Sequence, residues 1–164
     1  VAMEKKVPEE ITIQTGQGPF TLRLGGTIDR MDAKESTAIV DYKTGGSPKI
    51  PANIEQLFTP SETRPNYIFQ TFLYAAIMCR KQGLKLAPSL LYIHRAASES
   101  YSPVIEMGAR ASKVPVNNFA FYEDEFRERL SALLQEIYNP EEPFTQTEDA
   151  KKCEYCDFKR LCKK

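Results

Sequence analysis

The chain has 164 residues, of which 41% are hydrophobic, and this is enough for one compact domain with a single core. Lysine and arginine together number 22, as do aspartate and glutamate, so the formal net charge is zero. This balance excludes a strong overall field toward nucleic acid or a membrane, and any polyanion must therefore be bound by a local patch.

The first part of the chain has the pattern of an antiparallel sheet. Alternating and β-branched residues around a Gly-Pro turn predict strands. These expected strands cover residues 10–15, 20–30 and 36–44. The next segment, residues 46–64, carries glycine, serine and proline with few periodic apolar residues, which predicts a mobile loop.

The second part of the chain carries two helical patterns. Apolar residues recur at helical spacing from about Asn66 to Lys81, and again from Tyr122 to the Asn-Pro pair at 139–140, which predicts a helix end. The apolar stripe of the second helix consists of Phe126, Leu130, Leu133, Leu134 and Ile137. Apolar strands are expected at residues 87–95 and, on a weaker pattern, at 102–107.

No feature of the sequence points to secretion or to a membrane. It contains no signal-peptide pattern and no apolar run of about 18 residues, the length that a membrane-spanning helix needs. We therefore expect a cytoplasmic protein. The chain opens directly in a strand pattern, so we also expect it to be a piece of a longer protein.

Two acidic residues are predicted to meet across a hairpin. The strands on either side of the polar stretch 32–36 are most simply joined as a hairpin. If its centre lies near Glu35, Asp29 lies opposite Asp41, because each is six residues from the centre. Side chains alternate along a strand, so Asp41 and Lys43 share one face. Two carboxylates directly across a ladder repel each other.

A cation between the two acids would relieve this repulsion. Oxygen ligands suit Mg²⁺, which binds one or two carboxylates and keeps water and substrate phosphates in its other positions. Lys43 lies one pleat further along, where it can position or polarise a water near a phosphate. The pattern therefore predicts a phosphodiester hydrolysis site, and glycines at 25–26 and 45–46 leave room for a ligand or another backbone. The alternative is a set of surface charges on a solvated sheet face.

Three motifs in a fixed order resemble a known family. The stretches GGTIDRMD, IVDYKTG and QTFLYAA together resemble the RecB-like nucleases of the PD-(D/E)XK superfamily, over about residues 20–80. The resemblance implies a restriction-endonuclease-like α/β core, in which a mixed β-sheet is flanked by helices, and metal-dependent cleavage of DNA. It implies that Asp29 and Asp41 bind the metal, Mg²⁺ or Mn²⁺, and that Lys43 is the catalytic lysine.

Gln70 and Tyr74 match the helical motif of this family, which the resemblance places beside the catalytic centre. They are four residues apart and are therefore neighbours on one helix face. That face is rotated away from the apolar stripe, so the pair can point toward the sheet edge. The alternative is a half-exposed glutamine beside a partly buried tyrosine.

The last 14 residues form a basic tail with six basic and two acidic side chains, and three cysteines lie in it. These cysteines are Cys153, Cys156 and Cys162. Their spacing suits a tetrahedral zinc site or an iron–sulfur cluster, both of which need four ligands. In AddB-like members of the same group, this motif helps to hold a 4Fe–4S cluster with a cysteine from upstream of the core. The resemblance implies a nuclease core at 1–150 that lacks its upstream helix, and a tail at 151–164 that forms part of an iron–sulfur staple.

The remaining cysteine and the single histidine match no family position. Cys79 falls on the apolar face of its helix, so we expect it to be a small buried hydrophobic residue. His94 follows the helical motif, whereas the histidine ligand of this group comes from an N-terminal helix. We therefore expect His94 to be structural.

Two classes of function remain open. The first is an exonuclease-type, Mg²⁺-dependent deoxyribonuclease domain, attached to a helicase domain or subunit and acting on DNA in double-strand-break repair and recombination. The second is a non-catalytic DNA-binding or assembly module, stapled by an iron–sulfur cluster or zinc. The intact set of Asp29, Asp41 and Lys43 favours the nuclease. A stand-alone nuclease with the same motifs is an alternative setting.

Overall fold

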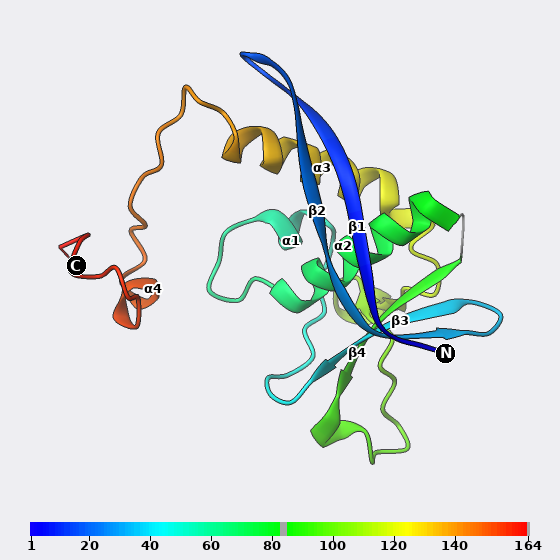
Figure 1. Cartoon of the computed structure of the whole chain (residues 1–164). Coiled ribbons are helices and arrows are strands. Elements are labelled where there is room, and N and C mark those ends of the chain that lie inside the picture. The colour runs from blue at the N-terminus through cyan, green and yellow to red at the C-terminus, as the bar shows by residue number, and fades with distance from the viewer. Residues whose placement is uncertain (83–84, 164) are drawn as a thin grey trace.

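The structure is a computed structural model that describes residues 1–82 and 85–163. Its centre is a mixed sheet of four strands in the order β1-β2-β3-β4, and Figure 1 shows the C-terminal helix apart from this sheet and the other helices beside it. The strands of this sheet are β1 (Ala2–Thr15), β2 (Gly18–Ala33), β3 (Thr37–Lys43) and β4 (Leu86–Tyr92). The helices are α1 (Glu55–Phe58), α2 (Asn66–Gln82), α3 (Ala120–Ile137) and α4 (Ala150–Glu154). The expected mixed α/β architecture is confirmed.

β1 and β2 form a long antiparallel hairpin with a turn at residues 16–17. β1 begins at Ala2, although the sequence predicted only 10–15, because its first half carries charged residues and a proline instead of alternating apolar side chains. Pairing with β2 extends the strand where its side-chain pattern is weak. The same pairing extends β2 from the expected 20–30 to Gly18–Ala33.

The hairpin of β2 and β3 has the predicted register. Its turn is centred on Glu35, and the ladder runs up to the pair Arg30 and Val40. The next pair in this register would be Asp29 and Asp41, but the ladder stops before it. The expected direct pairing of the two acids is therefore wrong, although the register brings them to the same level of the sheet.

β3 is a central strand, and its two neighbours run in different directions. It pairs antiparallel with β2 and parallel with β4, where Asp41 lies beside Leu90. The parallel pairing requires a crossover between the two strands, which residues 44–85 provide. α2, which lies in this crossover, begins and ends close to the expected 66–81. In this way the topology places α2 against the face of β3 that carries Asp41.

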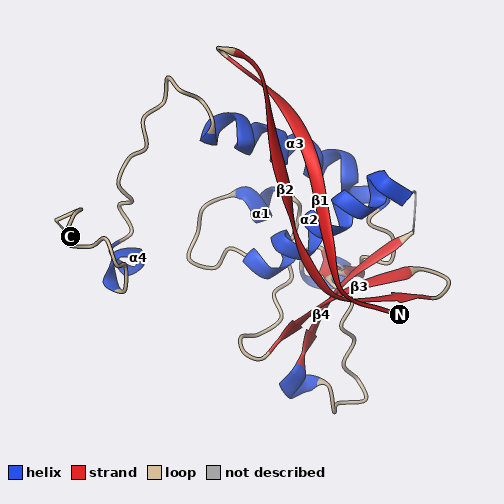
Figure 2. Ribbon diagram, in the orientation of Figure 1, coloured by secondary structure: helices blue, strands red, loops and turns tan. Residues whose placement is uncertain are grey.

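The core lies between the sheet and the two long helices. In Figure 2 the β1–β2 hairpin crosses in front of α2 and α3, and both helices contact β1. Aromatic rings join the two helices, with ring centroids 5.2 Å apart for Phe72 and Phe119 and 6.0 Å apart for Phe72 and Phe126. Such pairs add to the free energy of burial. None of the described helices is long and apolar enough to cross a membrane.

The segment expected as a mobile loop contains a short helix. α1 lies within residues 46–64 and buries Leu57 completely. Arg64 donates a hydrogen bond from Nε to the Leu57 carbonyl at 2.7 Å. The sequence pattern missed α1 because a single turn offers too few positions to show a helical period.

The strand expected at 87–95 is also shorter, since β4 ends at Tyr92 and continues as a 3-10 turn, Ile93–Arg95. The strand expected at 102–107 hydrogen-bonds irregularly along β4 through residues 103–105. Only its last two residues, β5 (Glu106–Met107), pair regularly, with β6 (Val114–Pro115).

α3 ends at Ile137, before the predicted Asn-Pro stop, and only part of its expected stripe is buried. Leu133 is half-buried and Ile137 is exposed, whereas Phe126, Leu130 and Leu134 lie in the core. The buried stripe is therefore shorter than predicted, since it ends at Leu134.

Arg127 of α3 ties three elements together. It donates to the Ala76 carbonyl of α2 and to Glu123 Oε1, at 2.8 Å, within α3. Its Nη1 lies 3.4 Å from Oε1 of the buried Glu9 in β1. One guanidinium therefore neutralises acids and satisfies a carbonyl at the junction of sheet and helices.

We expect Arg127→Met to lower the free energy of unfolding by about 2 kcal/mol, because hydrogen bonds from a charged donor to partly buried partners are lost. The measurement is urea unfolding. The matched control is Arg129→Met, since the ion pair of Arg129 with Glu125, at 3.0 Å, is exposed and its loss should cost less than about 0.5 kcal/mol. Equal effects of the two substitutions would contradict this account of the junction.

Candidate active site

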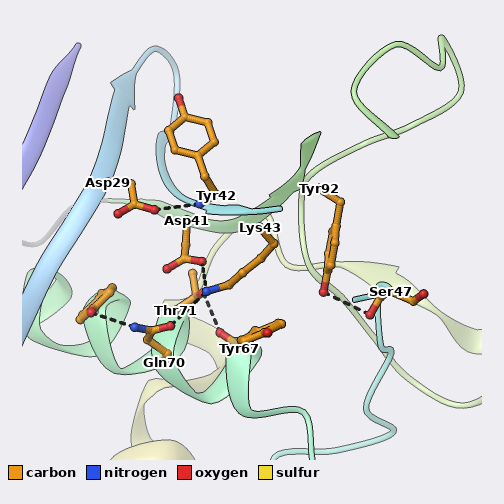
Figure 3. A network of polar contacts seen from close by, with 10 residues as sticks. Asp29, Asp41, Tyr42, Lys43, Ser47, Tyr67, Gln70, Thr71 and Tyr92 are labelled. Atoms are coloured by element: carbon orange, nitrogen blue, oxygen red, sulfur yellow. Dashed lines mark hydrogen bonds and ion pairs between the residues drawn. The ribbon is translucent and has the colours of Figure 1, made fainter. Parts of the chain in front are cut away.

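The last residues of β3 carry a buried ion pair. Lys43 Nζ lies 2.5 Å from Asp41 Oδ2, so the two side chains share one face of the strand, as predicted. Only 5% of Asp41 is exposed, and Lys43 is partly buried. Figure 3 shows Asp41, Lys43 and Gln70 pointing toward one another between β3 and α2. On this face of β3, Ile39 packs in the hydrophobic core, and the polar residues Asp41 and Lys43 follow toward the end of the strand.

Asp29 of β2 joins the same site by a backbone contact. Its Oδ2 accepts a hydrogen bond from the Tyr42 N–H at 2.9 Å. The carboxylate therefore takes the place that a ladder partner would have, which explains why the β2–β3 ladder stops at Arg30 and Val40. Both acids come to one place, but through a side-chain bridge instead of a cross-strand pair.

The environment of Asp41 favours its neutral form, or a cation beside it. Burial raises the pKa of Asp41 above its usual value, Lys43 opposes this shift, and the charge of Asp29 adds to it. The Oδ2 atom is fully buried and has no well-directed hydrogen bond from any described residue, although Lys43 Nζ is close to it. Nearby positive charge, not a directed donor, stabilises this oxygen.

α2 supplies the polar partners of Lys43. Lys43 Nζ donates to Gln70 Oε1 at 3.3 Å, and Gln70 Nε2 donates to the Tyr74 hydroxyl at 3.2 Å. Gln70 is half-buried at the site. Tyr74 is only 6% exposed and lies in the core, so the expectation that it points toward the sheet edge is wrong. Its hydroxyl reaches the site only through Gln70.

Gly26 of β2 makes the position of Tyr74 possible. A Cβ at Gly26 would lie 2.5 Å from the Tyr74 hydroxyl oxygen and 2.8 Å from Cε1 of its ring. The sequence predicted that glycines at 25–26 leave room for a ligand or a backbone. At Gly25 that room is taken by the β1 backbone, since a Cβ there would overlap the Val7 carbonyl oxygen, whereas at Gly26 it is taken by the ring of Tyr74.

Tyr67 is a neighbour of Lys43 that the sequence analysis did not identify. Lys43 Nζ lies 4.1 Å from the centroid of the Tyr67 ring, which is a cation–π contact. Tyr67, Gln70 and Tyr74 are spaced by three and four residues, so they form one stripe along α2. This spacing was a usable signal, but the apolar stripe beside it dominated the pattern.

The donor set fits a hard divalent cation. Asp29 and Asp41 offer carboxylate oxygens, and the buried Oδ2 of Asp41 lacks a directed donor. Within residues 1–82 and 85–163, no cluster of three or more His, Cys, Asp or Glu side chains is preformed. Two carboxylates with water and phosphate in the other positions is the coordination that Mg²⁺ accepts. Asp29 and Asp41 are the residues that would hold such an ion.

The tail cysteines are not gathered into one cluster in the described part of the chain. Cys153 is buried in α4, Cys156 is exposed, and Cys162 lies between these two in exposure. Cys79 is buried in α2, as predicted, and burial raises its pKa to about 11. His94 is exposed in the turn after β4 and is not part of the Asp41 site.

We expect Gly26→Ala to lower the free energy of unfolding by about 1–3 kcal/mol, because the new methyl group overlaps a ring locked in the core. The control is Gly45→Ala, where an added Cβ meets nothing within 4 Å and the effect should stay within about 0.5 kcal/mol. Chemical unfolding of both variants checks the comparison. A neutral Gly26→Ala would show that Tyr74 is not held against β2.

Comparison with known proteins adds one clear finding to this geometry. A search of curated proteins and a search of solved structures returned no significant match. The family model of the PD-(D/E)XK nuclease superfamily matches residues 2–163, almost the whole chain. The mixed sheet flanked by helices is the restriction-endonuclease-like architecture expected for that family. The chain therefore belongs to the PD-(D/E)XK nuclease superfamily.

Proposed function

We propose that the chain is a metal-dependent deoxyribonuclease domain that hydrolyses phosphodiester bonds at the end of β3. The observation that supports this most directly is the buried Asp41–Lys43 pair, with Asp29 beside it and an Asp41 oxygen that lacks a directed donor. A buried carboxylate whose charge is compensated by one neighbouring ammonium is costly to a fold, so it is more typical of a functional site than of a structural contact.

In this proposal Asp29 and Asp41 hold Mg²⁺ or Mn²⁺, which supplies Lewis-acid polarisation of a phosphoryl oxygen and lowers the pKa of water. Lys43 orients the attacking water or stabilises the negative charge that develops on the phosphate. Gln70 positions the Lys43 ammonium through its Oε1 atom, and Tyr74 positions Gln70. Side chains that are held in place by such a series of hydrogen bonds need little rearrangement when charge develops in the transition state.

The finer assignment follows the motif order. The stretches around Asp29, Asp41 and Gln70 resemble RecB-like and AddB-like nucleases, and the cysteine spacing of the tail agrees with the AddB-like pattern. On this basis we assign the domain an exonuclease-type activity, next to a cytoplasmic helicase domain or subunit, in double-strand-break repair and recombination. The division into a core at 1–150 and a tail at 151–164 belongs to the same proposal.

The decisive experiment separates metal binding from chemistry. We expect Mg²⁺ to raise the melting temperature of the wild-type chain by about 5 °C or more at saturation, and to have no such effect on Asp41→Asn. Lys43→Met should keep most of the Mg²⁺ effect and of the DNA affinity but lose about 10²- to 10³-fold in cleavage rate of end-labelled linear DNA. Thermal unfolding, DNA binding and single-turnover cleavage measure the three quantities.

Asp124→Asn and Lys34→Met are matched controls, because both residues are exposed and lie outside the site. Asp124 is on α3, and Lys34 is in the β2–β3 turn. They should behave as the wild type. An equal Mg²⁺ response of Asp41→Asn and the wild type would reject the metal assignment. A chain that binds DNA yet cleaves none with either metal would favour the non-catalytic module.

The tail cysteines provide three of the four ligands of a 4Fe–4S cluster in this proposal, and their spacing is the support for it. Cys79 is a poor fourth ligand, because it is buried in α2, where burial raises the pKa of its thiol. The fourth ligand would then come from outside this chain.

Reconstitution with iron and sulfide without oxygen tests the assignment. We expect the chain to bind less than four iron atoms per molecule, and the iron content and visible absorption to rise when a small external thiol is added. Cys156→Ser should abolish this binding, and Cys79→Ser should not. A full complement that depends on Cys79 would reject the proposed ligand set.

A further inference from the structure

A pocket that the proposed chemistry does not use is lined by Tyr67, the residue whose ring contacts Lys43. Its volume is about 310 Å³, which is at the small end of the range for ligand pockets. It is formed between the segment that follows β3 and the start of α2. Its main lining residues are Gly46, Lys49, Glu62, Arg64, Tyr67 and Tyr92.

Two tyrosine rings meet at Gly46. A Cβ at Gly46 would lie 3.6 Å from Tyr67 and 3.9 Å from Tyr92, and its φ of +82° favours glycine. Lys43 Nζ covers part of the Tyr67 ring, but the residue remains 44% exposed and lines the pocket. Tyr92 is held by a hydrogen bond from its hydroxyl to the Ser47 carbonyl at 3.2 Å. The pocket therefore has aromatic lining, and its Tyr67 ring also contacts the ammonium of Lys43.

The pocket is also lined by two positively charged side chains, those of Arg64 and Lys49. Arg64 is fixed by its Nε bond to Leu57 and by the Phe69 ring, 5.2 Å from its guanidinium. Its Nη groups donate to no described residue, so they can bind a phosphate. Lys49 Nζ donates to the carbonyls of Thr63 and Arg64 at 2.9 and 3.2 Å, which holds a second positive charge nearby.

The basic tail begins at the rim of this pocket. Lys151 Nζ lies 2.9 Å from Glu62 Oε1 and neutralises the acidic side chain among the main lining residues. The positive field of Arg64 and Lys49 is therefore not cancelled by Glu62. Further basic residues follow in the sequence at Lys152 and beyond.

We infer that this pocket holds one unpaired nucleotide of a DNA strand next to the phosphate to be cut, with its base against Tyr67 and its phosphate on Arg64. An aromatic face beside fixed positive groups is the arrangement by which proteins bind single strands. A base within a duplex is stacked on both faces and cannot lie on Tyr67. The inference rests on the proposed nuclease function, because that function places a phosphodiester beside Lys43.

The test measures binding without cleavage, in EDTA, by fluorescence anisotropy with a single-stranded oligonucleotide and a blunt duplex. Tyr67→Leu should lose about tenfold or more in single-strand affinity and little in duplex affinity. Tyr138→Leu is the matched control, because Tyr138 is 45% exposed at the far end of α3. An equal loss for both DNA forms, or no loss, would overturn the inference.

Tyr67→Leu could also displace Lys43, so two further measurements test the pocket without changing Tyr67. Arg64→Gln should make the dependence of log K on log salt shallower by about 0.7 for the single strand, and Arg129→Gln should not. In the wild-type chain, an oligonucleotide with one photoreactive 5-iodouracil should crosslink to the peptide that contains Tyr67. A crosslink confined to other peptides, or an unchanged salt slope, would reject the pocket as the binding site.

These readouts do not depend on catalysis. Selective single-strand binding that depends on Tyr67, in a chain that never cleaves DNA, would uphold the pocket and reject the nuclease. Cleavage that requires Asp41 would uphold the nuclease. If, in addition, the Tyr67→Leu variant bound each DNA form as tightly as the wild type does, the pocket would be rejected.

Discussion

The ion pair between Asp41 and Lys43 lies on a strand face that otherwise builds the core, and the surrounding elements keep its two charges together and partly out of water. A buried carboxylate is unfavourable unless a cation or donors compensate it. Lys43 provides the charge, and Asp29 and Gln70 fix the ends of the site from β2 and α2. The local arrangement of three elements therefore follows from one electrostatic requirement.

This requirement explains two departures from regular structure. The β2–β3 ladder ends early because the Asp29 carboxylate accepts the Tyr42 N–H, which keeps that backbone group satisfied while the strands separate. Tyr74 is buried instead of lining the site. Its hydroxyl accepts a hydrogen bond from Gln70 on the core side of that residue, and Gly26 leaves the space for its ring. Both departures preserve hydrogen bonding while placing polar atoms at the end of a core strand.

The same geometry links the site to its surroundings. The parallel pairing of β3 with β4 requires the crossover that contains α2, and the start of α2 brings Tyr67 over Lys43. The segment between β3 and α2 then closes the aromatic and basic pocket around Gly46. The catalytic and strand-binding parts that we propose are thus built from one continuous crossover, so changes in its packing affect both.

The sequence by itself determined the α/β order, the register centred on Glu35, and the shared face of Asp41 and Lys43, because these depend on local periodicity and turn position. It also determined family membership through three ordered motifs. Only the tertiary structure decided how Asp29 reaches the site, why position 26 has no room for a Cβ, and that Tyr67 and Arg64 line one pocket. The contacts of Asp29 and Gly26 join residues on different elements, and the pocket also needs residues that follow β3; the free energies that select these arrangements come from packing and desolvation, which no local pattern records.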